Sequence, residues 1–187
     1  MNELDAARQS VMAVGVRRTT FSDVARRAEV SRMTLYRRHP DVHSILAALM
    51  TRDLGAIIQG AVAQAAGLPT ARERLVDALG HAVNGLSGDA LVLRILEVDP
   101  ELLLPYATDR IGETQRAILG ALERYIREGH DDGSIRADDP SAMAACLELA
   151  ARGFVFSARA TERACDPGHA VAQLRMMVDA YLKPIAA

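Results

Sequence analysis

The sequence predicts an all-α protein of about nine helices, and three observations support this prediction. Half of the 187 residues are apolar but only 4% are aromatic, a mixture rich in Ala, Leu, Val, Ile and Met that favours helices. Apolar residues recur at spacings of three and four along most of the chain, and no segment alternates as a half-buried strand does. The length suits one domain, or a small head on a larger body.

The charge distribution divides the chain into two unlike parts. Residues 1–50 hold 8 Arg against 5 acidic residues, whereas residues 51–187 hold 14 Arg and Lys against 19 acidic residues. The excess is concentrated in residues 15–39, with 7 Arg and 2 acidic residues. A basic head on an acidic body indicates that the head meets a polyanion and that the body does not.

The first predicted helix covers residues 4–14. Leu4, Ala7 and Val11 lie at helical spacing and form one apolar stripe, which indicates a helix with one face on a core. Gly15 ends this helix.

The next two predicted helices are short and each begins with a capping residue. Thr20 can cap a helix over residues 21–28, and Ser31 can cap a second helix over residues 32–38, since both hydroxyl side chains accept hydrogen bonds from free helix N–H groups. In the second helix only Leu35 is a clear core residue. Most of its surface is therefore predicted to be free.

The following helices form the larger body. Residues 42–66 predict one long helix that links head to body, stopped by Gly67 and Pro69. Thr70 and Glu73 form a capping box for the next helix, which we expect to break at residues 85–88. Further helices are predicted over residues 90–98, over residues 105–128 after a brief turn at 100–104, over residues 140–160 after Asp139, and from Pro167 after Asp166.

The last two predicted helices are unusually apolar for a chain end. Such a pair favours association with its own copy in a two-fold four-helix bundle. The alternative is that both helices only complete the core of a monomer. The expected dimer-interface residues are Cys146, Leu149, Gly153, Phe154, Val171, Leu174, Val178 and Tyr181.

Residues 20–31, TFSDVARRAEVS, followed by Thr34-Leu35-Tyr36, resemble the helix-turn-helix of TetR-type transcriptional regulators. The detailed resemblance covers roughly residues 4–50. It implies a helix-turn-helix DNA-binding domain at residues 1–48 and a helical ligand-binding and dimerisation domain at residues 49–187. It also implies a homodimer that places two reading helices in successive major grooves of a near-palindromic double-stranded operator.

The chemistry of the head then assigns roles on DNA. Arg32 and Thr34 can reach base edges and Met33 a thymine methyl group, while Tyr36 and Arg37 suit backbone phosphates. The full set of expected DNA contacts is Thr20, Ser31, Arg32, Met33, Thr34, Tyr36, Arg37, Arg38 and His43.

The resemblance has two departures at the start of the linking helix. TetR-type proteins commonly carry an aromatic residue and then a phosphate-binding lysine here, whereas this chain has His39 and Val42. We expect His43 or Arg38 to take over part of the phosphate contact.

TetR-like bodies usually bind a small effector, which shifts the spacing of the heads only if it binds one arrangement more tightly. The abundance of Leu, Ile, Val and Met favours a lipophilic effector. The polar candidates for such a site in otherwise apolar helices are His81, Asn84, Arg94, Glu97, Tyr106, Arg110 and Gln115.

Motifs of other function classes are missing from the sequence. It contains no P-loop, GxGxxG or HExxH, and His39 and His43 lack a third metal ligand, so we expect no enzyme, cofactor or metal site. Two cysteines are too few for a disulfide framework, and no membrane span or signal peptide is expected, which places the protein in the cytoplasm. The alternative function is an all-α small-molecule-binding protein or enzyme whose helix-turn-helix is structural.

Overall fold

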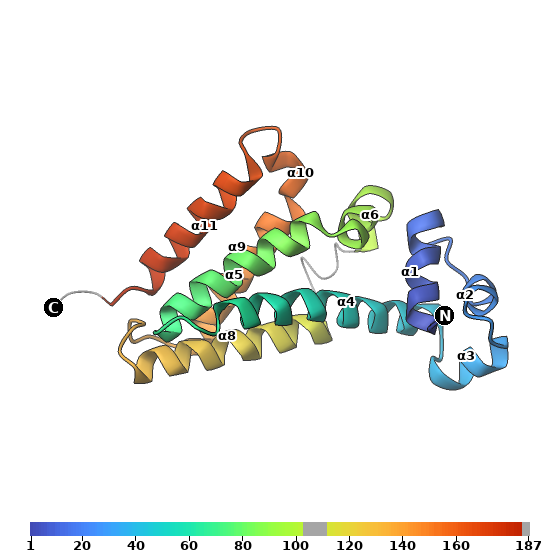
Figure 1. Cartoon of the computed structure of the whole chain (residues 1–187), viewed down its shortest axis with the longest axis horizontal. Coiled ribbons are helices and arrows are strands. Elements are labelled where there is room, and N and C mark those ends of the chain that lie inside the picture. The colour runs from blue at the N-terminus through green and yellow to red at the C-terminus, as the bar shows by residue number, and fades with distance from the viewer. Residues whose placement is uncertain (103–111, 185–187) are drawn as a thin grey trace. The chain divides into compact units, whose positions relative to one another are not determined.

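The computed structural model describes residues 1–102 and 112–184, which form ten α-helices and one 3₁₀ turn without strands (Figure 1). The all-α prediction is confirmed for this part of the chain. The elements are α1 (Glu3–Val14), α2 (Phe21–Ala28), α3 (Arg32–Arg38), α4 (Val42–Ala65), α5 (Ala71–Gly88), α6 (Ala90–Val98), η1 (Pro100–Leu102), α8 (Glu113–Asp131), α9 (Pro140–Phe156), α10 (Ala158–Thr161) and α11 (Pro167–Leu182).

The chain divides into two compact units, which we call the head unit and the body unit. The head unit comprises Met1–Gly55 with the described residues of Gly88–Ile111, and the body unit comprises Ala56–Ser87 with the described residues of Gly112–Ala187. Helix α6 therefore belongs to the head unit, although it follows α5 of the body. The functional boundary at residue 48 stays a prediction.

One apolar core holds the head unit together. Its members come from α1 to α3, from the first part of α4 and, through Leu91 and Ile95, from α6. Removing these side chains from water is the main stabilisation of the head. The buried cluster comprises Ala6, Ala7, Val11, Phe21, Val24, Ala25, Ala28, Leu35, Ile45, Leu46, Leu49, Leu91 and Ile95.

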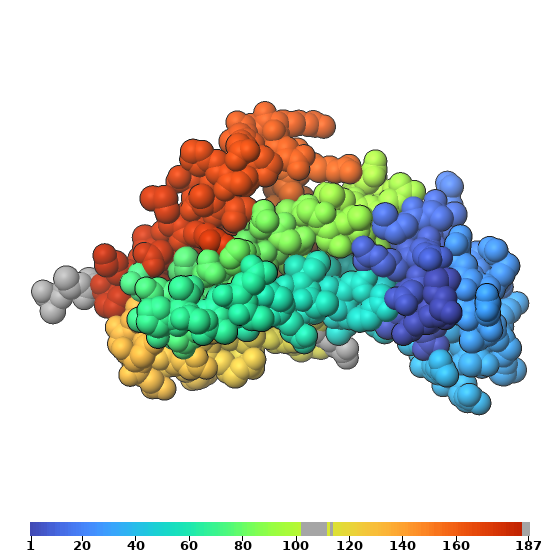
Figure 2. All heavy atoms as spheres, in the orientation of Figure 1, coloured from blue at the N-terminus to red at the C-terminus, as the bar shows by residue number. Residues whose placement is uncertain are grey.

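Polar contacts also join α6 to α1, whose atoms touch in Figure 2. Asp89 caps α6 by accepting from the N–H groups of its first turn, and it also receives Arg8 of α1 at 3.4 Å. Arg8 binds Asp53 of α4 at 2.5 Å. At the other end of α6, buried Asp99 accepts from the N–H of Val16 at 2.7 Å. Both ends of α6 are therefore attached to the head.

In the body unit, α5 runs without interruption from Ala71 to Gly88, so the break expected at residues 85–88 is wrong. A Cβ atom at Gly85 would lie 2.8 Å from Cγ2 of Ile57 on α4. Gly85 thus permits close packing of two helices, a role that the sequence pattern does not distinguish from a turn.

The helix expected over residues 105–128 also differs. Gly112 has an extended backbone and is the N-cap of α8, so this helix begins at Glu113, and it continues to Asp131. The expected beginning at Pro105 lies outside the described residues.

Helix α4 is long and apolar enough to cross a bilayer by length and composition alone, with a mean hydropathy of 1.4 in its most apolar window. The sequence predicts this long helix, over residues 42–66, but no membrane span. A single helix of this kind is weak evidence of a membrane span, because long helices in water-soluble proteins pass the same test. Its charged residues Arg52 and Asp53 form ion pairs with Asp5 and Arg8 of α1.

Candidate nucleic-acid interface

The turn between α2 and α3 is tight and carries one strained residue. Glu29 adopts a left-handed backbone with φ of 56°, the only positive φ of a non-glycine residue in the described chain. The N–H of Val30 then bonds the carbonyl oxygen of Ala25 at 3.1 Å, which closes the turn. Since a side chain in this region costs about 1 kcal/mol or more, the turn is imposed by the packing around it.

Thr20 caps α2 as the sequence predicts. Its Oγ accepts from the N–H of Asp23 at 3.2 Å and its hydroxyl donates to the Asp23 carboxylate at 2.7 Å. This hydrogen bond, followed by that from Arg26, holds the pKa of the exposed Asp23 below its usual value. Thr20 is exposed at the start of α2, where free N–H groups favour an anion.

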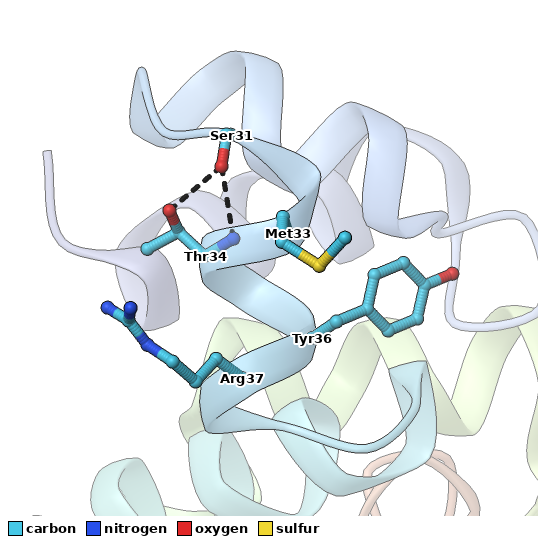
Figure 3. Close-up of a pocket in the computed structure, with 5 residues that line it drawn as sticks. All are labelled: Ser31, Met33, Thr34, Tyr36 and Arg37. Carbon is cyan, nitrogen blue, oxygen red and sulfur yellow. Dashed lines mark hydrogen bonds between the residues drawn. The ribbon is translucent and has the colours of Figure 1, made fainter.

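Ser31 caps α3, again as predicted. Its Oγ accepts from the N–H of Thr34 at 3.1 Å and lies 2.9 Å from the Thr34 hydroxyl (Figure 3). The cap fixes the backbone of the first turn of α3, so the directions in which the Arg32 and Met33 side chains project are also fixed.

The outer surface of α3 is almost entirely free. Leu35 is its one buried residue, while Met33 is 77% exposed. Arg32 and Arg37 are exposed and have no ion-pair partner among the described residues. Thr34 and Arg37 project from one side of the helix, Met33 and Tyr36 from the other (Figure 3). Together with Ser31 these four side chains line a shallow hollow of about 320 Å³.

Tyr36 stacks on Phe21 of α2, with ring centroids 4.6 Å apart and planes 9° from parallel. Phe21 is itself buried in the head core, so its ring gives the Tyr36 ring a fixed surface to pack on. The tyrosine hydroxyl is thereby held at the edge of the α3 surface. Tyr36 thereby fixes α3 against α2 while its polar end stays accessible.

Arg38 and His39 meet Glu3 of α1 at the end of α3. The carboxylate receives Arg38 at 2.7 Å and lies 3.3 Å from Nε2 of His39. Burial raises the pKa of Glu3, but the hydrogen bonds from Arg38 and His39 outweigh it and keep this pKa below its usual value. Arg38 thus already has a carboxylate partner, unlike Arg32 and Arg37.

The two sequence departures are resolved differently. Val42 is half-buried and packs against the head core, so it is a packing residue. His43, one residue later, is exposed and lies in the first turn of α4. A phosphate contact by His43 stays a prediction.

Comparison with known proteins decides the family. The family model described as bacterial regulatory proteins of the tetR family matches residues 4–49. Over 179 residues the chain is 31% identical to an uncharacterised HTH-type transcriptional regulator of Mycobacterium bovis, covering 96% of this chain and 92% of the relative. The chain belongs to the TetR family of transcriptional regulators. A counterpart from Mycobacterium tuberculosis is 30% identical over the same shares of both chains.

Solved structures show that the likeness in fold extends beyond the head to the body unit. FadR of Bacillus subtilis, in complex with stearoyl-CoA, superimposes with a TM-score of 0.72 at 19% identity, covering 96% of this chain and 97% of that one. SmeT, the repressor of a multidrug efflux pump of Stenotrophomonas maltophilia, has a TM-score of 0.69 at 24% identity, covering 97% and 88%. At these identities the likeness concerns the fold alone.

The expected effector residues that the structure describes belong to different units of this TetR-family protein. His81 lies 3.4 Å from Asp77 of its own helix, and Arg94 lies 4.0 Å from Glu97 on α6. Asn84 is exposed on α5. Tyr106 and Arg110 lie outside the described residues. No shared site follows from these positions.

Gln115 is the exception, because it belongs to a polar cluster in the body unit. It accepts from the N–H of Gly112 at 3.1 Å and donates to Glu148 of α9 at 3.3 Å. Glu148 also pairs with Arg152 at 3.3 Å. The sequence analysis missed Glu148 and Arg152, although their spacing of four within an apolar helix was a usable signal.

The expected dimer residues separate into three groups by exposure. Cys146, Leu149 and Gly153 are exposed on α9. Leu174 and Val178 are each only 1% exposed, because the apolar stripe of α11 faces the body's own core. Placing these two side chains at a dimer interface was therefore wrong. Phe154, Val171 and Tyr181 are half-buried.

The exposed apolar residues of α11 are instead Met176 and Met177, with Met176 65% exposed. The thiol of Cys146 on α9 lies close enough to the Tyr181 hydroxyl of α11 to interact with it. Burial, and then the Cys146 thiol, raise the pKa of Tyr181. Together Cys146, Leu149, Gly153, Met176 and Met177 form what we call the bundle face.

Proposed function

We propose that this TetR-family regulator is a cytoplasmic homodimeric repressor that binds a near-palindromic operator and leaves it when a small effector binds the body. The observation that carries the proposal is α3, a capped helix with a single core anchor and two exposed arginines without ion-pair partners in the described chain. A helix that serves packing alone would bury more of its surface.

The base-reading roles follow from the geometry of α3. Arg32, in its first turn, suits the two acceptors of a guanine in the major groove, while Thr34 and Met33 suit a thymine methyl group. Arg37, in the last turn, and Thr20, at the start of α2, suit phosphates. Recognition by one head then covers only a half-site.

A second head must therefore come from a second copy. The bundle face supports this, because it exposes apolar side chains of both α9 and α11. Two-fold symmetry would then require the two α3 helices to lie about 34–36 Å apart, one turn of DNA.

The attachment of α6 supports a route from the body to the head. Asp89 binds Arg8 of α1 and Asp99 binds the N–H of Val16 in the loop after α1, so any effector that moves α6 also acts on the head. FadR of B. subtilis was solved with stearoyl-CoA and SmeT with triclosan. We infer that the effector is likewise lipophilic. Among the described residues, the cluster of Gln115, Glu148 and Arg152 is the strongest candidate for binding a polar group of the effector.

The test is a gel shift with DNA that flanks the protein's own gene. We expect a selective complex that weakens steeply with salt, because phosphate contacts release counterions. A shuffled sequence of equal composition is the control. Binding that ignores sequence, or no binding at low salt, would leave an all-α small-molecule-binding protein or enzyme with a structural helix-turn-helix as the better explanation.

A further inference from the structure

The loop between α1 and α2 carries two exposed arginines, Arg17 and Arg18, that the DNA contacts above do not use. Arg18 has no ion-pair partner among the described residues. Arg17 has two, because its Nε lies 2.8 Å from Glu101 in η1, directly after α6, and 4.0 Å from buried Asp99. All four residues belong to the head unit.

The backbone of this loop is fixed by hydrogen bonds. The N–H of Val16 donates to buried Asp99, and the hydroxyl of Thr19 donates to the carbonyl oxygen of Gly15 at 2.8 Å. Gly15 has φ of +86°, and a Cβ there would lie 2.8 Å from Asp99 Oδ2. The two arginines are therefore presented from an ordered loop.

Their position favours contact with phosphate. Arg18 stands two residues before Thr20, the cap of α2, and two residues of chain span at most about 7 Å. The start of α2 is where the proposed function places a phosphate, and an arginine fork suits its oxygens.

Residues 39–51, which follow α3, contain no arginine or lysine. Val42, at the start of α4, packs against the head core. Arg38 is already bound to Glu3. Arg17 and Arg18, just before α2, would supply the phosphate-binding charge that the residues after α3 lack.

We propose that Arg17 and Arg18 bind operator phosphates beside the start of α2, and that Glu101 competes with phosphate for Arg17. This inference rests on the proposed DNA binding. The Arg17–Glu101 pair is exposed on both sides, so it is weak in water, and a phosphate can displace the carboxylate. Because Glu101 lies in η1, directly after α6, a movement of α6 would move Glu101 and so change how readily Arg17 binds phosphate.

The experiment measures the affinity of the full-length protein for its operator, and for shuffled DNA, between 50 and 200 mM salt. Arg18→Gln should weaken binding to both DNAs by roughly three- to tenfold and reduce the salt slope by about 0.9, as the loss of one phosphate contact does. Glu101→Gln should tighten binding by about two- to fivefold, the range that an exposed ion pair contributes.

A double-mutant cycle isolates the competition. Arg17→Gln should weaken binding more in the Glu101→Gln background than in the native one, because there the nearer carboxylate no longer competes with phosphate for the arginine. Arg124→Gln removes the same charge from an exposed position on α8 of the body unit, and it should change neither affinity nor slope. Equal melting temperatures would show that all variants are folded.

The outcomes separate the two proposals. If the native protein binds no DNA selectively, the proposed function fails. If it does bind, but Arg18→Gln matches Arg124→Gln, the phosphate contact is overturned. Additive effects of Arg17→Gln and Glu101→Gln would overturn the competition between Glu101 and phosphate.

Discussion

Two surfaces of this protein expose large apolar side chains, and the charges around them differ completely. On α3, Met33 stands between Arg32 and Thr34 with Arg37 one turn further on. On the bundle face, Leu149 is 56% exposed, and the nearby charged residues are paired inside the body unit, Glu148 with Arg152 and Arg175 with Asp77.

The difference teaches that exposure of an apolar side chain does not by itself identify its partner. Free guanidinium groups beside Met33 favour a polyanion with methyl groups in its grooves. An apolar face without free charge favours another apolar face, and in a two-fold assembly that face can be its own copy. Four sets of substitutions test the different roles of the two surfaces.

The largest effect is expected when charge is placed on the bundle face. Leu149→Asp combined with Met176→Glu would bury unpaired charges in the proposed interface, which costs about 3–5 kcal/mol. We expect monomers in sedimentation velocity and loss of operator binding. Met12→Glu changes a methionine exposed on α1 and should leave the dimer intact. A dimer that survives the double change would place the interface elsewhere.

Next is the anchor of the reading helix. Leu35→Ala removes the one buried side chain of α3 and should lower the free energy of unfolding of the head by about 2–5 kcal/mol. Denaturant unfolding measures this loss, and DNA binding should fall while the dimer persists. Met33→Ala is the matched control on the exposed side of the same helix. If both changes lower the free energy of unfolding equally, the Met33 side chain packs against the head as Leu35 does.

We expect base reading by Arg32, in the first turn of α3, and phosphate binding by Arg37, in its last turn. Arg32→Ala should cost about 1–3 kcal/mol on the cognate operator and relax the preference at one base pair, whereas Arg37→Ala should weaken all sequences alike. Competition titrations against a library of single-base operator variants measure both. Identical profiles for the two variants would contradict their assigned roles.

The smallest effect concerns the turn between α2 and α3. Glu29→Gly should relieve the left-handed strain at φ 56° and stabilise the head by about 0.5–1 kcal/mol. Thermal unfolding monitored by circular dichroism provides the measurement. Glu29→Ala, which keeps a Cβ, is the control. A loss of stability with glycine would mean that the Glu29 side chain makes an important contact.

The head could be predicted almost residue by residue because its signals are local. Thr20 and Ser31 cap helices that begin at the next residue, and a cap is a contact over three residues. The attachment of α6 could not be predicted, since Arg8 and Asp89 are 81 positions apart. Nothing in the spacing of either residue identifies the other.

The body was harder because helical periodicity does not say what covers an apolar face. The stripe of Leu174 and Val178 was correctly identified but assigned to a partner instead of to the protomer's own core. Gly85 was taken for a helix break because close packing against Ile57 leaves no signal in the sequence. Most of the expected DNA contacts, by contrast, depend on exposure within the short helix α3, whose sequence offers only one core residue.

The stack of Tyr36 on Phe21 also has a spectroscopic consequence. The chain has no tryptophan and only four tyrosines, so fluorotyrosine labelling would introduce four ¹⁹F nuclei. The ring current of Phe21, 4.6 Å away, displaces the resonance of Tyr36 from that of an unstacked ring. The reading helix therefore carries its own reporter, and its arrival on an operator can be followed by ¹⁹F NMR without attaching a dye.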